Sequence, residues 1–127
     1  MICIKGYVGN IEEKTLGNDY FREVLFTAPH SQLVVMALQP GEEIGMETHP
    51  EHDQFFRFES GHGEVVLDGE KSLVSNGFAV VIPAGTEHNV VNTGSEVMKL
   101  YTIYSPAEHK DGTVHRTMTE ALAAHEA

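Results

Sequence analysis

Short apolar runs separated by turn residues fill the sequence from residue 21 to residue 104. The runs are rich in Val, Ile, Phe and Tyr, and the segments between them contain Gly, Pro, Asn or Asp. Runs of this length at regular spacing are typical of strands in an all-β sandwich or barrel. We therefore predict strands over residues 21–27, 32–38, 54–59, 64–67, 78–82, 88–92 and 97–104.

Two local signals add detail to this all-β prediction. Asp68-Gly69 lies between two apolar runs, and its glycine supplies the positive φ that a tight hairpin turn needs. Thr117 and Glu120 have the spacing of a helix capping box, which predicts a short C-terminal helix docked on the strands. One face of that helix carries Met118, Ala121, Leu122 and His125. The tail is the only part of the chain predicted to be helical.

The charge balance excludes several classes of partner. The chain has 8 basic and 19 acidic residues, which leaves a formal net charge of −11. Such a surface repels nucleic-acid phosphates and anionic lipid headgroups, so we expect no nucleic-acid partner and no membrane partner. The single cysteine, Cys3, cannot form an internal disulfide, and no apolar run approaches the ~20 residues that span a bilayer. We expect a single domain over residues 1–127, located in the cytoplasm.

The strongest motif covers residues 77–92 and reads Gly-x5-Pro-x-Gly-x2-His-x3-Asn. It describes a strand, a tight turn in which Pro83 sets φ and Gly85 relieves strain, and a returning strand that begins at His88. A side chain at a strand end beside a rigid turn is held in a fixed position, as a metal ligand must be. The motif therefore marks His88 as a candidate ligand.

A second block covers residues 41–61. Glu47 and His49 are two residues apart, so on a strand both side chains project from the same face. Gln54 opens the next strand and shares a face with Phe56 and Phe58, as expected of the inner wall of a barrel. His52 falls in the connecting loop, and its role stays open.

Together the two blocks resemble the cupin family, whose members are small double-stranded β-helix barrels with jelly-roll topology. The block at 77–92 matches the family's second motif at every defined position, and the block at 41–61 matches the first motif in length and in its bounding glycines. The chain is also similar to small bacterial cupins named after mannose-6-phosphate isomerase. The resemblance implies a barrel core over about residues 31–106, and it implies a homodimer because cupins of this type commonly pair.

The resemblance also implies a metal site. The family usually places His, His and Glu where this chain has Glu47, His49 and Gln54, and His88 supplies the remaining ligand. Moving the carboxylate to Glu47 leaves the charge of the donor set unchanged and favours Mn²⁺, Fe²⁺ or Zn²⁺ over soft metals. We predict one divalent metal ion on these four side chains. The alternative is a metal-free polar barrel mouth in which they hydrogen-bond one another.

Less direct signals concern the substrate. Phe56, Phe58 and Met98 are candidate substrate-binding side chains of the barrel wall, although Met98 also fits as core filling. By strand alternation Arg57 and Lys99 point outward, so no cation is expected inside and a phosphorylated substrate is disfavoured.

Two functions remain open at this point. The first is a metal-dependent enzyme of dioxygenase, isomerase or epimerase type, acting on a small polar non-phosphorylated metabolite. The second is a non-catalytic module that binds a small molecule or a sugar in the barrel. No acid–base residue is identified, so the catalytic residues, the substrate and the reaction stay open.

Overall fold

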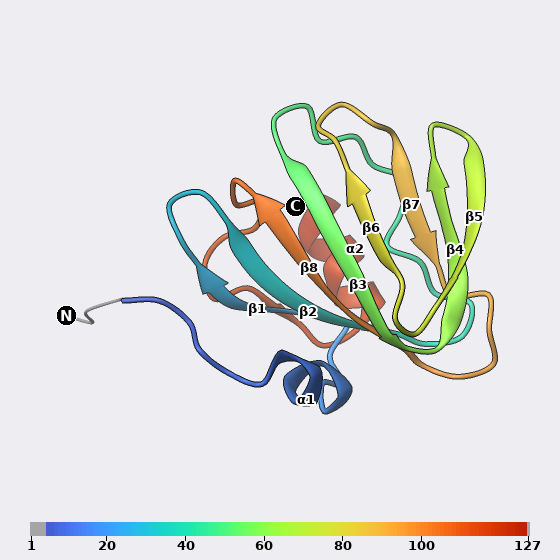
Figure 1. The fold of residues 1–127 in the computed structure, drawn as a ribbon, viewed down its shortest axis with the longest axis horizontal. Coiled ribbons are helices and arrows are strands. Elements are labelled where there is room, and N and C mark those ends of the chain that lie inside the picture. Colours follow the sequence, from blue (N-terminus) through green and yellow to red (C-terminus); the bar gives the residue numbers. More distant parts are fainter. Residues whose placement is uncertain (1–4, 127) are drawn as a thin grey trace.

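Two antiparallel β-sheets build the protein, as the computed structural model of residues 5–126 shows (Figure 1). Cys3 lies outside these described residues. The larger sheet has the order β6 (Ala79–Ile82), β3 (Asp53–Ser60), β8 (Met98–Ser105), β2 (Gln32–Leu38), β1 (Arg22–Thr27) and β9 (Val114–His115). The smaller sheet has the order β5 (Glu70–Ser75), β4 (His62–Leu67) and β7 (His88–Val91).

The core lies between the inner faces of these sheets. Strand β8 shows the alternation that this requires, because every second residue from Met98 to Tyr104 is buried and those between are half-buried. Strand β3 alternates in the same way. The largest side chains of the resulting core are Tyr104, Phe56, Phe58, Met36, Leu38, Ile82, Met98 and Leu100. The all-β prediction and the jelly-roll architecture are confirmed.

The predicted hairpin turn joins β4 to β5. Asp68 has φ 48° and Gly69 has φ 84°, so both turn residues adopt the left-handed conformation of a type I′ turn. The register pairs Leu67 with Glu70 directly across the turn. The dipeptide Asp-Gly therefore sets the register of the whole hairpin.

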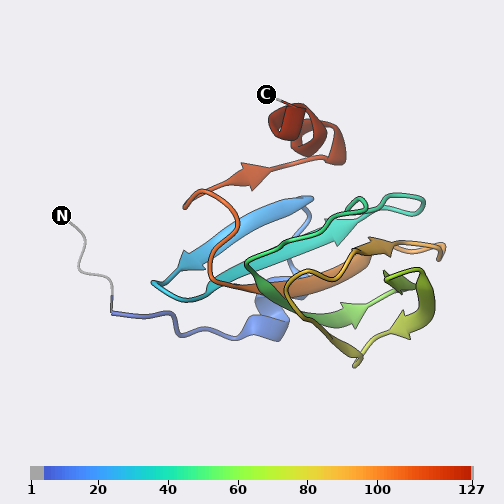
Figure 2. The same ribbon diagram turned by 90° about the horizontal axis from the view of Figure 1, so that it is seen from above.

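Two helices flank the larger sheet on opposite faces (Figure 2). The C-terminal helix α2 (Met118–Glu126) is confirmed, and the Thr117 hydroxyl accepts a hydrogen bond from the Glu120 amide as the capping box predicts. The expectation that only the tail is helical is wrong, because α1 spans Ile11–Leu16. Its N-cap is Asn10, whose side chain accepts from the Glu13 amide, a signal that was present in the sequence.

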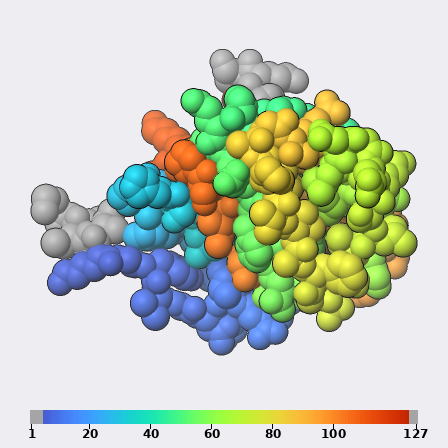
Figure 3. All heavy atoms as spheres, turned by 45° about the horizontal axis from the view of Figure 1, so that its top comes forward, coloured from blue at the N-terminus to red at the C-terminus, as the bar shows by residue number. Residues whose placement is uncertain are grey.

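The segment that contains α1 (blue) lies against the strands in Figure 3 rather than apart from them. Its contact is fixed by Lys99, whose Nζ donates to the carbonyls of Leu16 and Asn18 and pairs with Asp19 at 3.1 Å. Lys99 thus points away from the core, as predicted. Among the described residues no helix is long and apolar enough to cross a membrane.

Candidate metal centre

The residues that lead into β3 are drawn against β7 by backbone pairing. Glu47 and His88 form an antiparallel bridge in which each amide donates to the other's carbonyl, at 2.9 and 2.8 Å. The Gly85 amide, at φ 88°, donates to the His49 carbonyl. The turn of the 77–92 motif therefore holds the first block against β7 and brings Glu47, His49 and His88 together, and their role as metal ligands stays a prediction.

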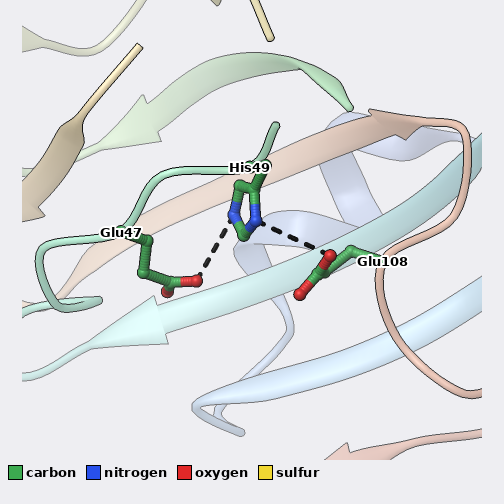
Figure 4. Close-up of side chains that lie close together, drawn as sticks. All are labelled: Glu47, His49 and Glu108. Carbon is green, nitrogen blue, oxygen red and sulfur yellow. Dashed lines mark ion pairs between the residues drawn. The ribbon is translucent and has the colours of Figure 1, made fainter. Parts of the chain in front are cut away.

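Glu47, His49 and Glu108 form a cluster that could hold a metal ion, with one ligand atom from each lying within 4.8 Å of the others. His49 Nε2 lies 3.3 Å from Glu47 Oε2, and His49 Nδ1 lies 3.6 Å from Glu108 Oε1. Figure 4 shows the imidazole between the two carboxylates. A single metal ion can bind only one of the two ring nitrogens of His49. One carboxylate therefore lies beside the nitrogen that binds the ion, and the other carboxylate lies beside the nitrogen that does not.

His88 is oriented by its own turn. The side chain is 2% exposed, and its Nδ1 lies 2.9 Å from the Thr86 carbonyl, to which it donates. In a neutral imidazole Nε2 is then the unprotonated nitrogen, which is the form that binds metals. The ring lies 5.2 Å from the ring of His49, measured between centroids. His88 thus lies beside the cluster with Nε2 free of this hydrogen bond, without being one of the cluster's three residues.

Gln54 is buried on the inner face of β3, opposite Tyr104 of β8. Its Nε2 donates to Thr102 Oγ1 at 3.0 Å, whereas its Oε1 is buried with no hydrogen-bond partner among the described residues. The ring of Tyr104 in turn packs edge-on against His49, with 5.9 Å between centroids. An orphaned amide oxygen in this place fits a weak oxygen donor to a cation better than a closed hydrogen-bond network.

Burial controls the protonation of this region. Burial lowers the pKa of His49. The nearby carboxylates of Glu47 and Glu108 raise this pKa, but by less than burial lowers it. Burial also raises the pKa of Tyr104, so that side chain keeps its proton. A lowered pKa leaves His49 neutral near pH 7, the state in which an imidazole coordinates a metal.

Glu108 was missed by the sequence analysis. It lies in the loop after β8, beyond the expected barrel core, and no motif surrounds it. His52 Nε2 lies 3.2 Å from Glu108 Oε1, and His52 Nδ1 lies 2.8 Å from the Pro106 carbonyl. His52 therefore contacts both Glu108 and the backbone of the loop that carries it. Only tertiary contacts could show this.

A cavity of about 390 Å³ opens beside the cluster. Glu47 and Glu108 line it together with Arg22, and α2 contributes Met118, Ala121 and Leu122. The expectation that no cation faces the interior is wrong, because it considered only Arg57 and Lys99. Arg22 shares the inner face of β1 with Val24 and is 6% exposed.

The predicted substrate-binding residues Phe56, Phe58 and Met98 are at most 1% exposed and belong to the core. The residues that line the cavity are others, so a role for these three in binding stays a prediction. Asn92, the last residue of the 77–92 motif, has a structural role. Its Nδ2 donates to the carbonyls of Leu38 and Glu96, and its Oδ1 accepts from the Gly94 amide.

Comparison with known proteins decides the family. A family model described as "Cupin domain" matches residues 34–104, which is more than half of the chain. The chain belongs to the cupin family. The matched region of this cupin contains Glu47, His49, Gln54 and His88, whereas Arg22 and Glu108 lie outside it. The narrower likeness to the mannose-6-phosphate isomerase group stays a prediction.

Similar proteins share most of the chain. This cupin is 45% identical over 126 residues to the uncharacterized protein YrkC of Bacillus subtilis. The matched segment is 94% of this chain and 68% of YrkC. It is 46% identical over 113 residues to the uncharacterized protein L612 of Acanthamoeba polyphaga mimivirus. The matched segment is 85% of this chain and 70% of L612. The crystal structure of BH2720 from Bacillus halodurans aligns with a TM-score of 0.92 at 45% identity, covering 94% and 95% of the two chains. The fold is thus shared with BH2720, and YrkC and L612 match most of the chain in sequence.

Proposed function

We propose that this cupin is a metal-dependent enzyme that acts on a small polar metabolite in the cavity beside Glu47, His49 and Glu108. The observation that carries the proposal is that Glu47 and Glu108, two carboxylates that line this cavity, lie on either side of the buried imidazole of His49. Such a cavity, with few convergent polar groups, is the usual form of a small-molecule site. The ligands of the ion are assigned to Glu47, His49 through Nε2, His88 through Nε2, and Gln54 through Oε1.

Three features support this assignment over a ligand role for Glu108. His49 Nε2 faces Glu47, and His88 Nε2 is left free by the bond from Nδ1 to Thr86. Gln54 Oε1 is buried without a partner among the described residues. Glu108 then faces the second nitrogen of His49, the place at which a carboxylate orients a metal-binding histidine.

The mixed nitrogen and oxygen donor set suits Mn²⁺, Fe²⁺ or Zn²⁺. When bound, such an ion acts as a Lewis acid on an oxygen of the substrate. The chain's own residues prepare the site. Glu108, held by His52, keeps His49 in one orientation, and burial keeps that imidazole neutral. The helix α2 covers the cavity and reduces the access of water to it.

Calorimetric titration of metal-free protein with Mn²⁺ tests the assignment. Glu47→Gln removes the only negative charge among the assigned ligands and His88→Ala removes a ligand, so each should weaken binding by about a hundred-fold or more, the upper end of the effect of supporting residues. Glu108→Gln alters only the orientation of His49 and should cost about ten-fold. Glu51→Gln is the matched control, because Glu51 is an exposed acid of the same loop and should leave affinity unchanged.

The outcomes separate the alternatives. Equal losses in Glu47→Gln and Glu108→Gln would place both carboxylates on the ion and overturn the assignment. Wild-type protein that binds none of Mn²⁺, Fe²⁺ and Zn²⁺ would leave a metal-free binding module. If the metal binds, screening of oxygen uptake and isomerisation with small diols, thiols, phenols and hydroxy acids tests for catalysis.

A further inference from the structure

Arg22 occupies an unusual place in this acidic chain. It lies on β1 between β2 and β9, opposite Met36 on one side and His115 on the other. Alternation along β1 places Arg22 on the inner face, where it is 6% exposed and lines the same cavity as Glu47 and Glu108. Two carboxylates of the metal cluster and this guanidinium therefore face the same cavity.

The charge of Arg22 has no anionic partner in the described residues. No carboxylate of the described chain lies within 4.0 Å of it, and its Nε is buried without a hydrogen-bond partner there. One nitrogen, Nη1, lies 3.1 Å from His115 Nδ1, and the guanidinium stacks 5.3 Å from the centroid of the Phe21 ring. A guanidinium has five N–H donors, and its Nη2 group makes no hydrogen bond within the described residues, so that group can donate to a ligand. Burying an unpaired charge is costly unless something else balances it.

A purely structural role does not explain this charge. Arg22 does help to hold β9, through its bond to His115. That bond needs only a neutral donor, because burial and the nearby Arg22 lower the pKa of His115 and leave its imidazole uncharged. A glutamine could supply such a donor without a buried charge. The positive charge is therefore an additional property of the cavity.

We propose that Arg22 binds the carboxylate group of the small molecule that enters this cavity, so that the substrate is a monocarboxylate. The proposal deepens the proposed function and rests on it for the identity of the cavity as the substrate site. A guanidinium matches a carboxylate with two parallel hydrogen bonds. Glu47 as a ligand and Glu108 beside His49 are two carboxylates of the cavity whose charges together offset a divalent ion, which leaves the charge of Arg22 for one substrate anion. A phosphate dianion would exceed that balance beside Glu47 and Glu108.

The test compares propionate with propionamide, which have similar size and differ by one charge. Both are titrated into the full-length, Mn²⁺-loaded protein by calorimetry, and the preference is the ratio of their dissociation constants. The bound metal also favours propionate over propionamide. The quantity that tests Arg22 is therefore the difference in this preference between the wild type and each variant. We expect Arg22→Gln to reduce the preference for propionate at least about ten-fold, as loss of a charge-assisted pair does.

Two matched variants control for structure and for overall charge. His115→Ala removes the bond that ties Arg22 to β9 but keeps the guanidinium, so the preference should persist. Arg57→Gln removes the same charge from a half-exposed arginine that already pairs with Glu59, and the preference should again persist. A preference that Arg22→Gln leaves unchanged, or that His115→Ala abolishes equally, would overturn the proposal.

A second measurement needs no variant of Arg22. The other arginines of the chain are Arg57 and Arg116, and conservative lysine variants of these two assign the Nε–H resonances in arginine-labelled protein. Propionate should shift the Arg22 resonance and propionamide should not. Absence of that shift overturns the proposal, and tighter Arg22-dependent binding of inorganic phosphate overturns the substrate class.

The Mn²⁺ affinity of each sample is measured separately. If Mn²⁺ binds normally but Arg22 has no effect on carboxylate binding, the proposal for Arg22 is wrong and the metal assignment is unaffected. Carboxylate binding that depends on Arg22, in protein that binds no metal, defeats the metal assignment alone.

Discussion

His109 makes the protein sensitive to acid. The residue lies in the loop after β8, where its Nε2 is 3.3 Å from Tyr104 Oη and its amide donates to Gln32. Burial, followed by the nearby charge of Arg22, lowers the pKa of His109 to about 3, from an ordinary value of 6.5. Between these two values the unfolded chain binds the proton more readily than the folded chain. Stability is therefore complete above pH 6.5 and falls as the pH drops toward 3.

The size of the effect follows from the same linkage. Each pH unit in this window removes about 1.4 kcal/mol of stability, so about 2 kcal/mol is lost by about pH 5. For a domain of this length each kcal/mol corresponds to about 3–5 °C in Tm, by interpolation between smaller and larger domains. The variant His109→Gln keeps a polar group near Tyr104 and removes the titration. Between about pH 7.5 and pH 5, its Tm should fall by about 6–10 °C less than that of the wild type.

Differential scanning calorimetry in metal-free buffer measures this difference, because a bound ion would add its own pH dependence. His30→Gln is the control, since His30 is exposed in the turn between β1 and β2 and should follow the wild type. Parallel plots of Tm against pH for the wild type and His109→Gln would refute the argument. The buried histidine would then make no measurable contribution to the pH dependence of stability.

Further predictions concern the metal, the core and assembly. Gln54→Glu adds a second negative donor and should tighten Mn²⁺ binding in calorimetric titration; weaker binding would contradict a ligand role for Gln54. Asn92→Ala leaves the buried carbonyl of Leu38 and its neighbours without donors and should cost about 2–4 kcal/mol in urea unfolding. Gly63→Ala would place a Cβ against Met98 and the Val91 carbonyl and should lower the Tm, whereas an unchanged Tm would show that these groups can move. Light scattering should give twice 14.0 kDa for the expected homodimer, and a mass of 14.0 kDa would contradict it.

The sequence alone determined the features that depend on local chemistry. Apolar alternation and turn residues predicted seven of the strands, because a strand with one buried face must alternate, whereas β5 and β9 were absent from that set. The dipeptide Asp68-Gly69 predicted the hairpin turn through its backbone conformation, and Thr117 with Glu120 predicted the start of α2. The short helix α1 was missed because six residues carry too little periodicity, although its cap was visible at Asn10.

The tertiary structure decided which distant side chains share the cavity. Glu47, His49 and His88 could be grouped from the family's motif spacing, although Glu47 meets β7 through an isolated bridge to His88 and His49 lies outside any strand, contrary to the expectation that both lie on a strand. Glu108 and Arg22 come from a loop after β8 and from β1, outside any motif, and no local pattern indicates which distant residues they meet. Their positions follow from pairing across the sheet, in which β9 joins β1 and the chain after β8 folds back over the cavity. Such pairing joins residues far apart in sequence, so the charge of the cavity, and with it the class of substrate, depends on the tertiary fold.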